Sequence, residues 1–185
     1  PHLRLFDNKR GYFLPWAWKD HAGDREEEHW FDSLGNLLAV TTGLATQTQA
    51  KKILDFIEKQ KINRPYPVES IYPSFKPKGR LWKSYFSKSD AGRLHHYLNG
   101  GIWPFIGGFY IAALVKIGKL EKAQKELKYL AEANKIGKKI DWEFNEWLDG
   151  KTGKPQGGVY QAWSVGMYIF AFECVKRKKV PFFSW

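Results

Sequence analysis

The sequence predicts an all-α fold in which buried helices alternate with amphipathic helices. Three stretches, around residues 30–44, 102–117 and 159–175, are apolar nearly all round, which is typical of helices that are covered on both sides. Two stretches, 47–60 and 120–137, are apolar on one face only. The order along the chain is buried, amphipathic, loop, buried, amphipathic, loop, buried. This alternation predicts part of a two-layer helical ring, with shielded inner helices and half-solvated outer helices.

The first elements follow from local residue patterns. Two apolar-rich runs flank Asn8–Gly11 in the sequence LFDNKRGYFLPWAW, which predicts a small N-terminal β-hairpin. Apolar residues then recur at helical spacing from Glu26 to Leu44, which predicts the first helix. Thr46 is a suitable N-cap for the second helix, QTQAKKILDFIEKQ. Residues 61–99 are rich in proline and lack periodicity, so we expect a long ordered loop, which is usually functional.

The remaining helices complete the alternation. The run GGIWPFIGGFYIAALVKIG predicts a buried helix, and Pro104 fits its first turn. The run LEKAQKELKYLAEANKIG predicts an amphipathic helix that ends at Gly137. The run VYQAWSVGMYIFAFECVKRKK predicts the last buried helix. About five helices are fewer than a complete (α/α)6 ring contains, so residues 1–185 are expected to form a single partial ring domain.

The net charge of +11 does not by itself indicate a nucleic-acid partner. The lysines fall in separate runs, at 51–52, 135–139 and 176–179. Such runs near helix ends are usually solvated and suit the helix dipole. No nucleic-acid-binding motif accompanies them. A nucleic-acid partner is therefore not favoured.

Cysteine usage and hydropathy indicate the compartment. Cys174 is the only cysteine, which excludes an internal disulfide and favours a reducing environment. No apolar run approaches the ~20 residues of a membrane-spanning helix. We expect a cytoplasmic protein without a membrane partner.

The aromatic content is a sharper signal for function. Nine tryptophans among 185 residues exceed ordinary usage, and core packing explains only some of them. The apolar face of a pyranose stacks on flat rings while polar groups bind its hydroxyls. An excess of aromatic residues therefore favours a carbohydrate ligand.

The segment WEFNEWLDGKTGKPQGGVYQAW, from Trp142 to Trp163, places two glutamates among aromatic residues. An extended backbone would put alternate residues on opposite faces, with Trp142, Phe144 and Glu146 on one and Glu143, Asn145 and Trp147 on the other. Glu146 would then lie beside aromatic surface, next to the turn at Asp149–Gly150. Such a carboxylate suits a general base that deprotonates a water molecule. A solvated glutamate on a hairpin is the alternative.

Four stretches resemble a known family in the same order. HYLNGGIWP (96–104) looks like the Y-H-N-G-G-S-W-P signature of neutral/alkaline invertases. DSLGNLLAVTTGLAT (32–46), NEWLDGKTG (145–153) and YQAWSVGMYIFA (160–171) are similar to its F-x-L-G-N, P-E-Y-Y-D-G-K and Y-Q-T-W-S stretches. Two positions depart from the signature, because Leu98 replaces its histidine and Ile102 its serine.

The resemblance implies a fold, an activity and a catalytic residue. It implies an inverting glycosidase of the (α/α)6 clan, whose relatives include amylo-α-1,6-glucosidase-like enzymes. The matched motifs belong to the C-terminal half of the family's catalytic domain and put its catalytic base at Glu146. The family's general-acid aspartate lies in the N-terminal half, and this chain has no counterpart to it. The departures at Leu98 and Ile102, together with the changed acidic and arginine positions just before L-G-N at residues 28–32, put sucrose in doubt as the substrate.

The other candidate substrate-binding residues lie at the predicted ends of the inner helices: Asp32, Asn99, Gly100, Trp103, Gln161 and Trp163. Gln161 can both donate to and accept from sugar hydroxyls, and Trp163 can stack on a ring; helix packing is the alternative. Gly100 permits close approach of the backbone and free N–H groups toward a ligand, or it forms the simple start of a helix. Asp32 could bind a hydroxyl or cap a helix. No ligand set surrounds His95 and His96, so we expect neither a metal nor a cofactor.

The sequence therefore predicts the C-terminal part of an (α/α)6 toroid that hydrolyses a glycosidic bond of a di- or oligosaccharide. The general acid would come from a missing N-terminal half, and that half or a second copy of the chain would be the protein partner. The alternative is a half-toroid without activity that binds a carbohydrate or a partner.

Overall fold

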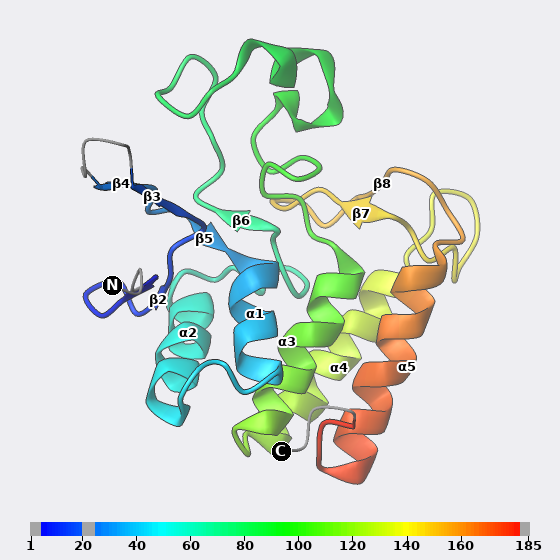
Figure 1. Ribbon diagram of the computed structural model, residues 1–185. Helices are drawn as coiled ribbons and strands as arrows, with labels where there is room; N and C mark the ends of the chain where they lie inside the picture. Colours follow the sequence, from blue (N-terminus) through cyan, green and yellow to red (C-terminus); the bar gives the residue numbers. More distant parts are fainter. Residues whose placement is uncertain (1–4, 20–24, 182–185) are drawn as a thin grey trace.

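A computed structural model describes residues 5–19 and 25–181, and five helices form most of it (Figure 1). The helices are α1 (Ser33–Thr41), α2 (Gln47–Lys59), α3 (Pro104–Lys116), α4 (Leu120–Lys135) and α5 (Ala162–Arg177). Two short 3-10 turns, Ser84–Lys88 and Asp90–Gly92, lie in the long loop between α2 and α3. No helix in the described ranges is long and apolar enough to cross a membrane.

Short strands form antiparallel pairs around the helices. The pairs are β1 (Phe6–Asp7) with β2 (Tyr12–Phe13), β3 (Ala17–Lys19) with β4 (Arg25–Glu27), β5 (Phe31–Asp32) with β6 (Ile71–Tyr72), and β7 (Trp147–Leu148) with β8 (Pro155–Gln156). The pair of β1 and β2 is the predicted N-terminal hairpin. The prediction of a mainly helical chain with a small hairpin is therefore confirmed.

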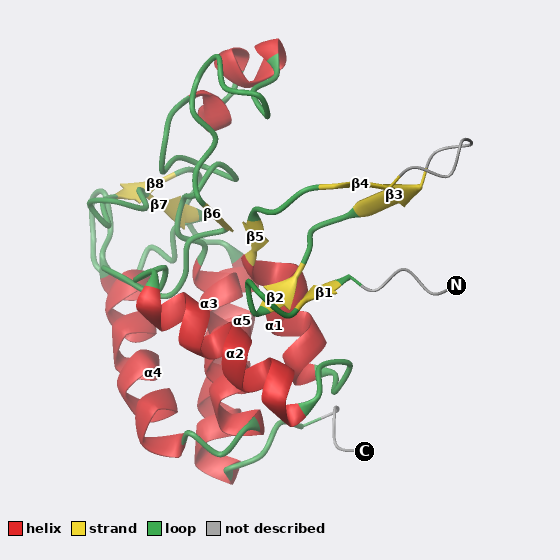
Figure 2. Cartoon of the chain, turned by 90° about the vertical axis from the view of Figure 1, so that its left-hand side faces the viewer, coloured by secondary structure: helices red, strands yellow, loops and turns green. Residues whose placement is uncertain are grey.

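The helices form two layers (Figures 1 and 2). Helices α1, α3 and α5 lie side by side, with α3 in the middle, and α2 and α4 lie against them. Buried residues occur on most sides of α3, and Ile111 and Leu114 are fully buried there. Helix α2 buries only one face, which contains Ile53, Leu54 and Ile57. The predicted alternation of buried and half-solvated helices holds for α1 to α4. It is wrong for α5, which was predicted to be covered on both sides but buries only Ser164, Ala171 and Cys174, because no described residue covers its outer face.

Local signals explain where three of the helices begin or end. Thr46 caps α2 in a capping box, because its side chain accepts from the Gln49 N–H and the Gln49 side chain accepts from the Thr46 N–H. Pro104 is in the first turn of α3, where its missing N–H has no cost. Helix α4 ends at Lys135, two residues before the Gly137 that was predicted to end it.

The predicted start of the first helix was wrong. Residues 25–27 and Phe31–Asp32 are strands, and α1 begins only at Ser33. Two long-range interactions hold the preceding segment extended. Phe31 pairs with Tyr72 in the strand ladder, and the buried Glu28 accepts two hydrogen bonds of 2.6 and 2.7 Å from the Arg80 guanidinium. Neither interaction leaves a periodic signal near residue 30.

Helices α1, α3 and α5 begin at the same end of the molecule (Figure 1). Asp32, Trp103 and Gln161 are the N-cap residues of α1, α3 and α5. The loop 61–99 and the segment between α4 and α5 lie at this end as well (Figure 1). The predicted site residues come from these helix ends and from the two connecting segments.

Candidate active site

Five residues line a cleft of about 420 Å³ at this end of the molecule: Tyr97, Trp103, Phe105, Glu146 and Trp163. Trp103 and Phe105 come from the start of α3, and Trp163 comes from the first turn of α5. The fold thus brings together three residues predicted from the sequence, namely Glu146, Trp103 and Trp163. Tyr97 and Phe105 were not predicted, although both flank or lie within the signature-like stretch 96–104.

The two tryptophans that line the cleft differ in how far their side chains are exposed. Trp103 is almost fully buried, its Nε1 donates to the Tyr97 carbonyl at 3.1 Å, and the two rings lie 5.1 Å apart. Trp163 is 48% exposed. Trp103 is therefore a fixed wall, whereas Trp163 presents a ring face that a sugar can cover.

Glu143 is a structural acid. It is only 2% exposed, and its carboxylate accepts the backbone N–H groups of Lys138, Lys139 and Ile140 at 2.6, 3.1 and 3.2 Å. The bond from Lys138 is the largest influence on the Glu143 pKa, and the three bonds together lower that pKa from its ordinary value. The carboxylate therefore holds the turn after α4 and is not available to a substrate.

Glu146, three residues later, reaches the cleft. The Gly158 N–H donates to its Oε2 at 3.0 Å, and the Glu146 N–H donates to the Gly158 carbonyl at 2.8 Å. Its Oε1 has no hydrogen-bond partner among the described residues. One oxygen of the Glu146 carboxylate is thus oriented by the backbone.

The Gly-Gly pair of the sequence permits this contact. Gly157 has a φ of +64°, and a Cβ atom there would lie 2.6 Å from Glu146 Oε2 and 2.7 Å from the Trp147 ring. Any other residue would therefore push the glutamate away. The pair places the backbone directly against the candidate base.

The extended backbone predicted over residues 142–148 is wrong in part. Only Trp147–Leu148 is a strand, and Trp142 and Phe144 have φ angles of 64° and 48°. The sorting of side chains nevertheless follows the prediction, because Glu143, Asn145 and Trp147 are buried while Trp142 is exposed. The rings that share a cleft with Glu146 come from α3, α5 and the loop before α3 rather than from its own segment.

Asn99 and Gly100 support the long loop. The buried Asn99 side chain accepts from the Phe75 N–H at 2.6 Å and donates to the carbonyls of Phe75, Ala91 and Arg93 at 3.1–3.3 Å. Gly100 has a φ of +90°, and its N–H donates to Ser70 Oγ at 3.2 Å. The expectation that this N–H is free for a ligand was therefore wrong.

Gln161 and Asp32 lie outside the cleft. Gln161 is the N-cap of α5, and its Nε2 donates to the Val159 carbonyl at 3.3 Å. Asp32 is the N-cap of α1, and burial raises the pKa of its carboxyl although the backbone N–H groups of Gly35 and Leu34 act to lower it. It lines a second compartment of about 490 Å³, whose walls include Tyr97 and Phe105 of the cleft.

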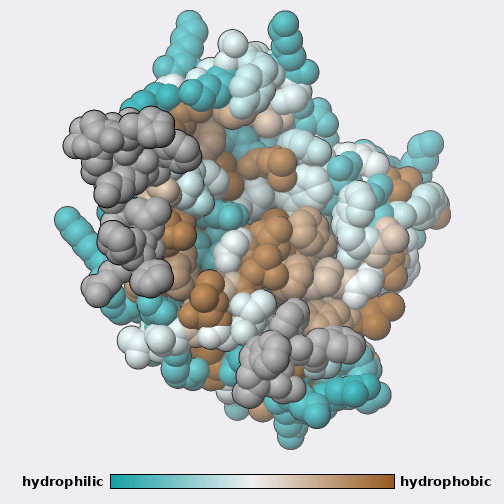
Figure 3. Space-filling view, viewed as in Figure 1, coloured by the Kyte–Doolittle hydropathy of each residue, from teal (hydrophilic) through white to brown (hydrophobic). Residues whose placement is uncertain are grey.

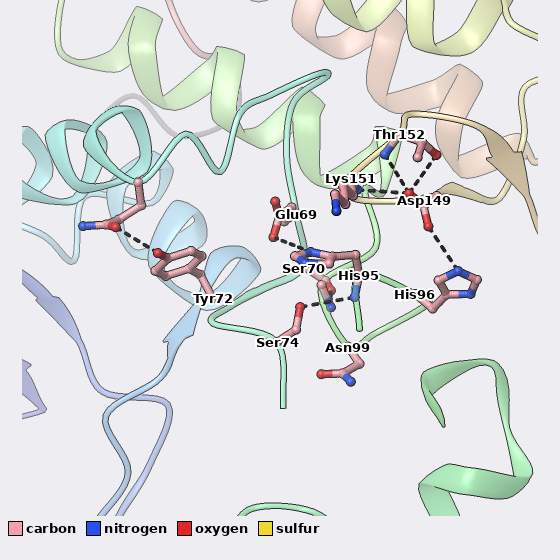
Figure 4. Close-up of polar contacts among 12 residues, drawn as sticks. Glu69, Ser70, Tyr72, Ser74, His95, His96, Asn99, Asp149, Lys151 and Thr152 are labelled. Atoms are coloured by element: carbon pink, nitrogen blue, oxygen red, sulfur yellow. Dashed lines mark hydrogen bonds and ion pairs between the residues drawn. The ribbon is translucent and has the colours of Figure 1, made fainter. Parts of the chain in front are cut away.

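A polar network ties the loop 61–99 to the turn that follows Glu146 (Figure 4). His96 Nε2 lies 3.1 Å from Asp149 Oδ2, and the other Asp149 oxygen accepts from Thr152 N at 2.7 Å. Beside them, burial and the charge of Asp149 raise the pKa of Glu69 to about 8, and His95 Nδ1 lies 3.9 Å from that carboxyl. No group of three or more His, Cys, Asp and Glu within the described ranges could hold a metal ion.

Comparison with known proteins gives the family. The sequence profile of the family described as alkaline and neutral invertase matches residues 6–178. The chain is 31% identical over 166 residues to probable alkaline/neutral invertase D of Arabidopsis thaliana, covering 87% of this chain and 29% of that protein. It is 30% identical over 152 residues to cytosolic invertase 1 of Oryza sativa subsp. japonica, covering 80% of this chain and 26% of that protein.

Among solved structures, the chain is similar to the GH63 mannosylglycerate hydrolase from Thermus thermophilus in complex with Tris and D-glycerate. The TM-score is 0.64 at 19% identity, and the match covers 89% of this chain and 35% of that chain. This likeness concerns the fold alone.

The relatives set the frame for function. The chain spans less than a third of the length of the curated relatives it matches. Their names include a cytosolic, a mitochondrial and a chloroplastic protein, so the cytoplasmic location stays a prediction. On the profile match over nearly its whole length, the chain belongs to the alkaline and neutral invertase family of glycoside hydrolases.

Proposed function

We propose that this chain supplies the general base and an aromatic sugar-binding wall of an inverting glycoside hydrolase that acts on a di- or oligosaccharide. The observation that carries the proposal is the oriented Glu146 carboxylate in a cleft with Trp163. Membership in a family of glycoside hydrolases supports it.

The proposed reaction is a single displacement. Glu146 Oε1 takes a proton from a water molecule while the water oxygen forms a bond to the anomeric carbon. The bond from that carbon to the leaving oxygen breaks, and a carboxylic acid donates a proton to that oxygen. The two carboxyl groups of such enzymes lie roughly 6.5–9.5 Å apart, which leaves room for the water. We propose that this acid lies on an N-terminal half of the ring.

The remaining candidates take supporting roles in this proposal. Trp163 stacks on the sugar that is cleaved, and Trp103 fixes the opposite wall. Asn99 and Gly100 hold the loop 61–99 in place. The Asn99 side chain accepts from the Phe75 N–H, and the Gly100 N–H donates to Ser70 Oγ. Asp32 binds a hydroxyl in the adjoining compartment, and Gln161 binds one at the start of α5.

The partner is proposed from the exposed apolar surface of α5. Ile169 and Phe172 are 56 and 45% exposed, and hydrophobic side chains gather on the face seen in Figure 3. A soluble monomer rarely leaves a large apolar patch uncovered. Because the curated relatives are much longer than this chain, we propose that an N-terminal half of the ring covers it.

Substitution of the base in the complete enzyme tests the function. Glu146→Gln is expected to keep the fold and to reduce kcat by roughly 10²–10⁴-fold, as removal of a general base does. Glu132→Gln, which changes an exposed glutamate of α4, is the matched control and should leave kcat unchanged. Activity of Glu146→Gln within a few-fold of the parent would sink the assignment. Sugar binding without turnover by the unaltered enzyme would favour a non-catalytic carbohydrate-binding half-toroid.

A further inference from the structure

The peptide group that joins Gly157 and Gly158 lies between two charged side chains. Its N–H, which belongs to Gly158, donates to Glu146 Oε2 at 3.0 Å. Its carbonyl, which belongs to Gly157, accepts from Lys138 Nζ at 2.6 Å. The N–H and C=O of a trans peptide point in opposite directions, so one planar group connects the ammonium to the carboxylate.

This arrangement changes the strength of the contact to Glu146. A cation at the carbonyl oxygen draws electron density along the amide, which makes the N–H a better donor. The acceptor is itself a carboxylate, and bonds with a charged partner are the stronger ones. Lys138 therefore strengthens the bond that orients Glu146, although its Nζ does not contact the carboxylate in this arrangement.

The position of Lys138 is fixed by the other glutamate of the segment. Glu143 accepts the Lys138 N–H at 2.6 Å, and its carbonyl accepts the Tyr160 N–H at 2.6 Å. The turn with the lysine and the backbone that follows the Gly-Gly pair are thus attached to the same buried residue. The neighbouring Lys139 shares this turn and also donates its N–H to Glu143. Its side chain provides a matched comparison.

We propose that Lys138 is a positioning residue for the general base: acting through the Gly157–Gly158 peptide, it fixes the Glu146 carboxylate so that Oε1 is presented to the attacking water. The catalytic consequence rests on the proposed function, but the structural relay from ammonium to carboxylate does not.

The first test measures the effect of Lys138 on the Gly158 hydrogen bond and needs no activity assay. In the ¹⁵N-labelled 185-residue chain, the amide proton shift of Gly158 reports the strength of its hydrogen bond. Lys138→Met should move this resonance upfield, in the same direction as Glu146→Gln, while Lys138→Arg should restore it. Lys139→Met should leave it in place. An unmoved Gly158 resonance in folded Lys138→Met, with a clear shift in Glu146→Gln, would overturn the proposal.

The second test reads the consequence in the complete enzyme. Lys138→Met should lower kcat roughly three- to tenfold, with KM and the thermal midpoint unchanged. This loss is smaller than the loss expected if the whole hydrogen bond from the Gly158 N–H to the Glu146 carboxylate were removed. Lys138→Arg should recover kcat, and Lys139→Met should match the parent. Equal loss of kcat in Lys138→Met and Lys139→Met, or a parallel loss of thermal stability, would contradict a positioning role. If the parent enzyme has no glycosidase activity, the proposed function fails, and the amide shift alone still decides the relay.

Discussion

Glu143 and Glu146 are only three residues apart but differ in what their carboxylates contact. Glu143 is buried against three backbone N–H groups of one turn, whereas Glu146 accepts one and opens to the cleft. The sequence indicates Glu146 through its motif and through alternation of faces. It cannot indicate that Glu143 holds a turn, because that depends on left-handed backbone angles at Trp142 and Phe144. Side-chain sorting is local and predictable here, while the backbone path is not.

Trp163 allows a test of sugar stacking at a single residue. Its ring is 48% exposed and lines the cleft, so Trp163→Ala should weaken sugar binding more than it lowers stability. Binding by titration calorimetry and unfolding by denaturant measure the two effects. Loss of the roughly 3–5 kcal/mol that deletion of a core tryptophan costs, with sugar affinity intact, would make the ring structural. Trp16→Ala, at an exposed tryptophan outside the cleft, is the control.

Glu69 gives a prediction for the dependence of stability on pH. Burial and the Asp149 charge raise its pKa to about 8, above the ordinary value of 4.5. Between these two values the folded chain binds the proton more tightly than the unfolded chain, so the contribution of Glu69 to the unfolding free energy falls as the pH rises. Glu69→Gln removes this contribution. Relative to the parent, the variant should gain stability from about pH 5 to pH 8, with roughly 5 kcal/mol as an upper bound.

Denaturant unfolding at several pH values measures the effect of Glu69→Gln. His95 faces the same carboxyl at 3.9 Å, so His95→Gln is the companion variant. A constant stability difference between Glu69→Gln and the parent across this pH range would show that the carboxyl titrates in the folded chain as it does in water.

At the level of elements, local signals predict helices well and miss pairings that form at long range. The starts of α2 and α3 follow from a capping box and an N-terminal proline, and both signals lie within a few residues of the helix start. The start of α1 was misplaced because β5 pairs with β6, some forty residues later in the chain. The cleft was predicted in part for the same reason: Trp103, Glu146 and Trp163 belong to motifs, whereas Tyr97 and Phe105 join it only through the fold.

Helix α4 is attached to the loop after α2 by a buried acid. Glu126 is 1% exposed and accepts from the Arg64 guanidinium at 2.8 and 3.0 Å and from Asn63 at 3.1 Å. Glu126→Ala leaves these donors without their acceptor, so it should destabilise the fold by roughly 3–5 kcal/mol. Glu132→Ala, on the exposed side of α4, should change stability by less than about 0.5 kcal/mol. Similar midpoints for both variants in urea would contradict this account.

At the level of the whole molecule, the exposed α5 surface predicts association. Light scattering of the 185-residue chain should detect a species larger than a monomer, and added N-terminal half should replace self-association with a hetero-pair. Ile169→Lys and Phe172→Lys place charges on this surface and should yield monomers. Leu44→Lys changes an apolar residue that is 72% exposed after α1 and serves as the control. A parent chain that stays monomeric and hydrolyses sugar alone would refute both the half-ring and the absent acid.

The hydrogen bonds that orient Glu146 all form within one stretch of chain, from Lys138 to the start of α5. No residue outside the stretch donates a hydrogen bond to either glutamate in the described part of the chain. If Glu146 is the base and a second half supplies the acid, as proposed above, the base is oriented before that half docks, and docking has only to deliver the acid. A misplaced second half would change the distance between its acid carboxyl and the Glu146 carboxyl. It would not change the orientation of the Glu146 carboxylate. Imperfect assembly would then lower the rate of bond cleavage while sugar stacking on Trp163 persists, which makes rate rather than affinity the measure of correct assembly.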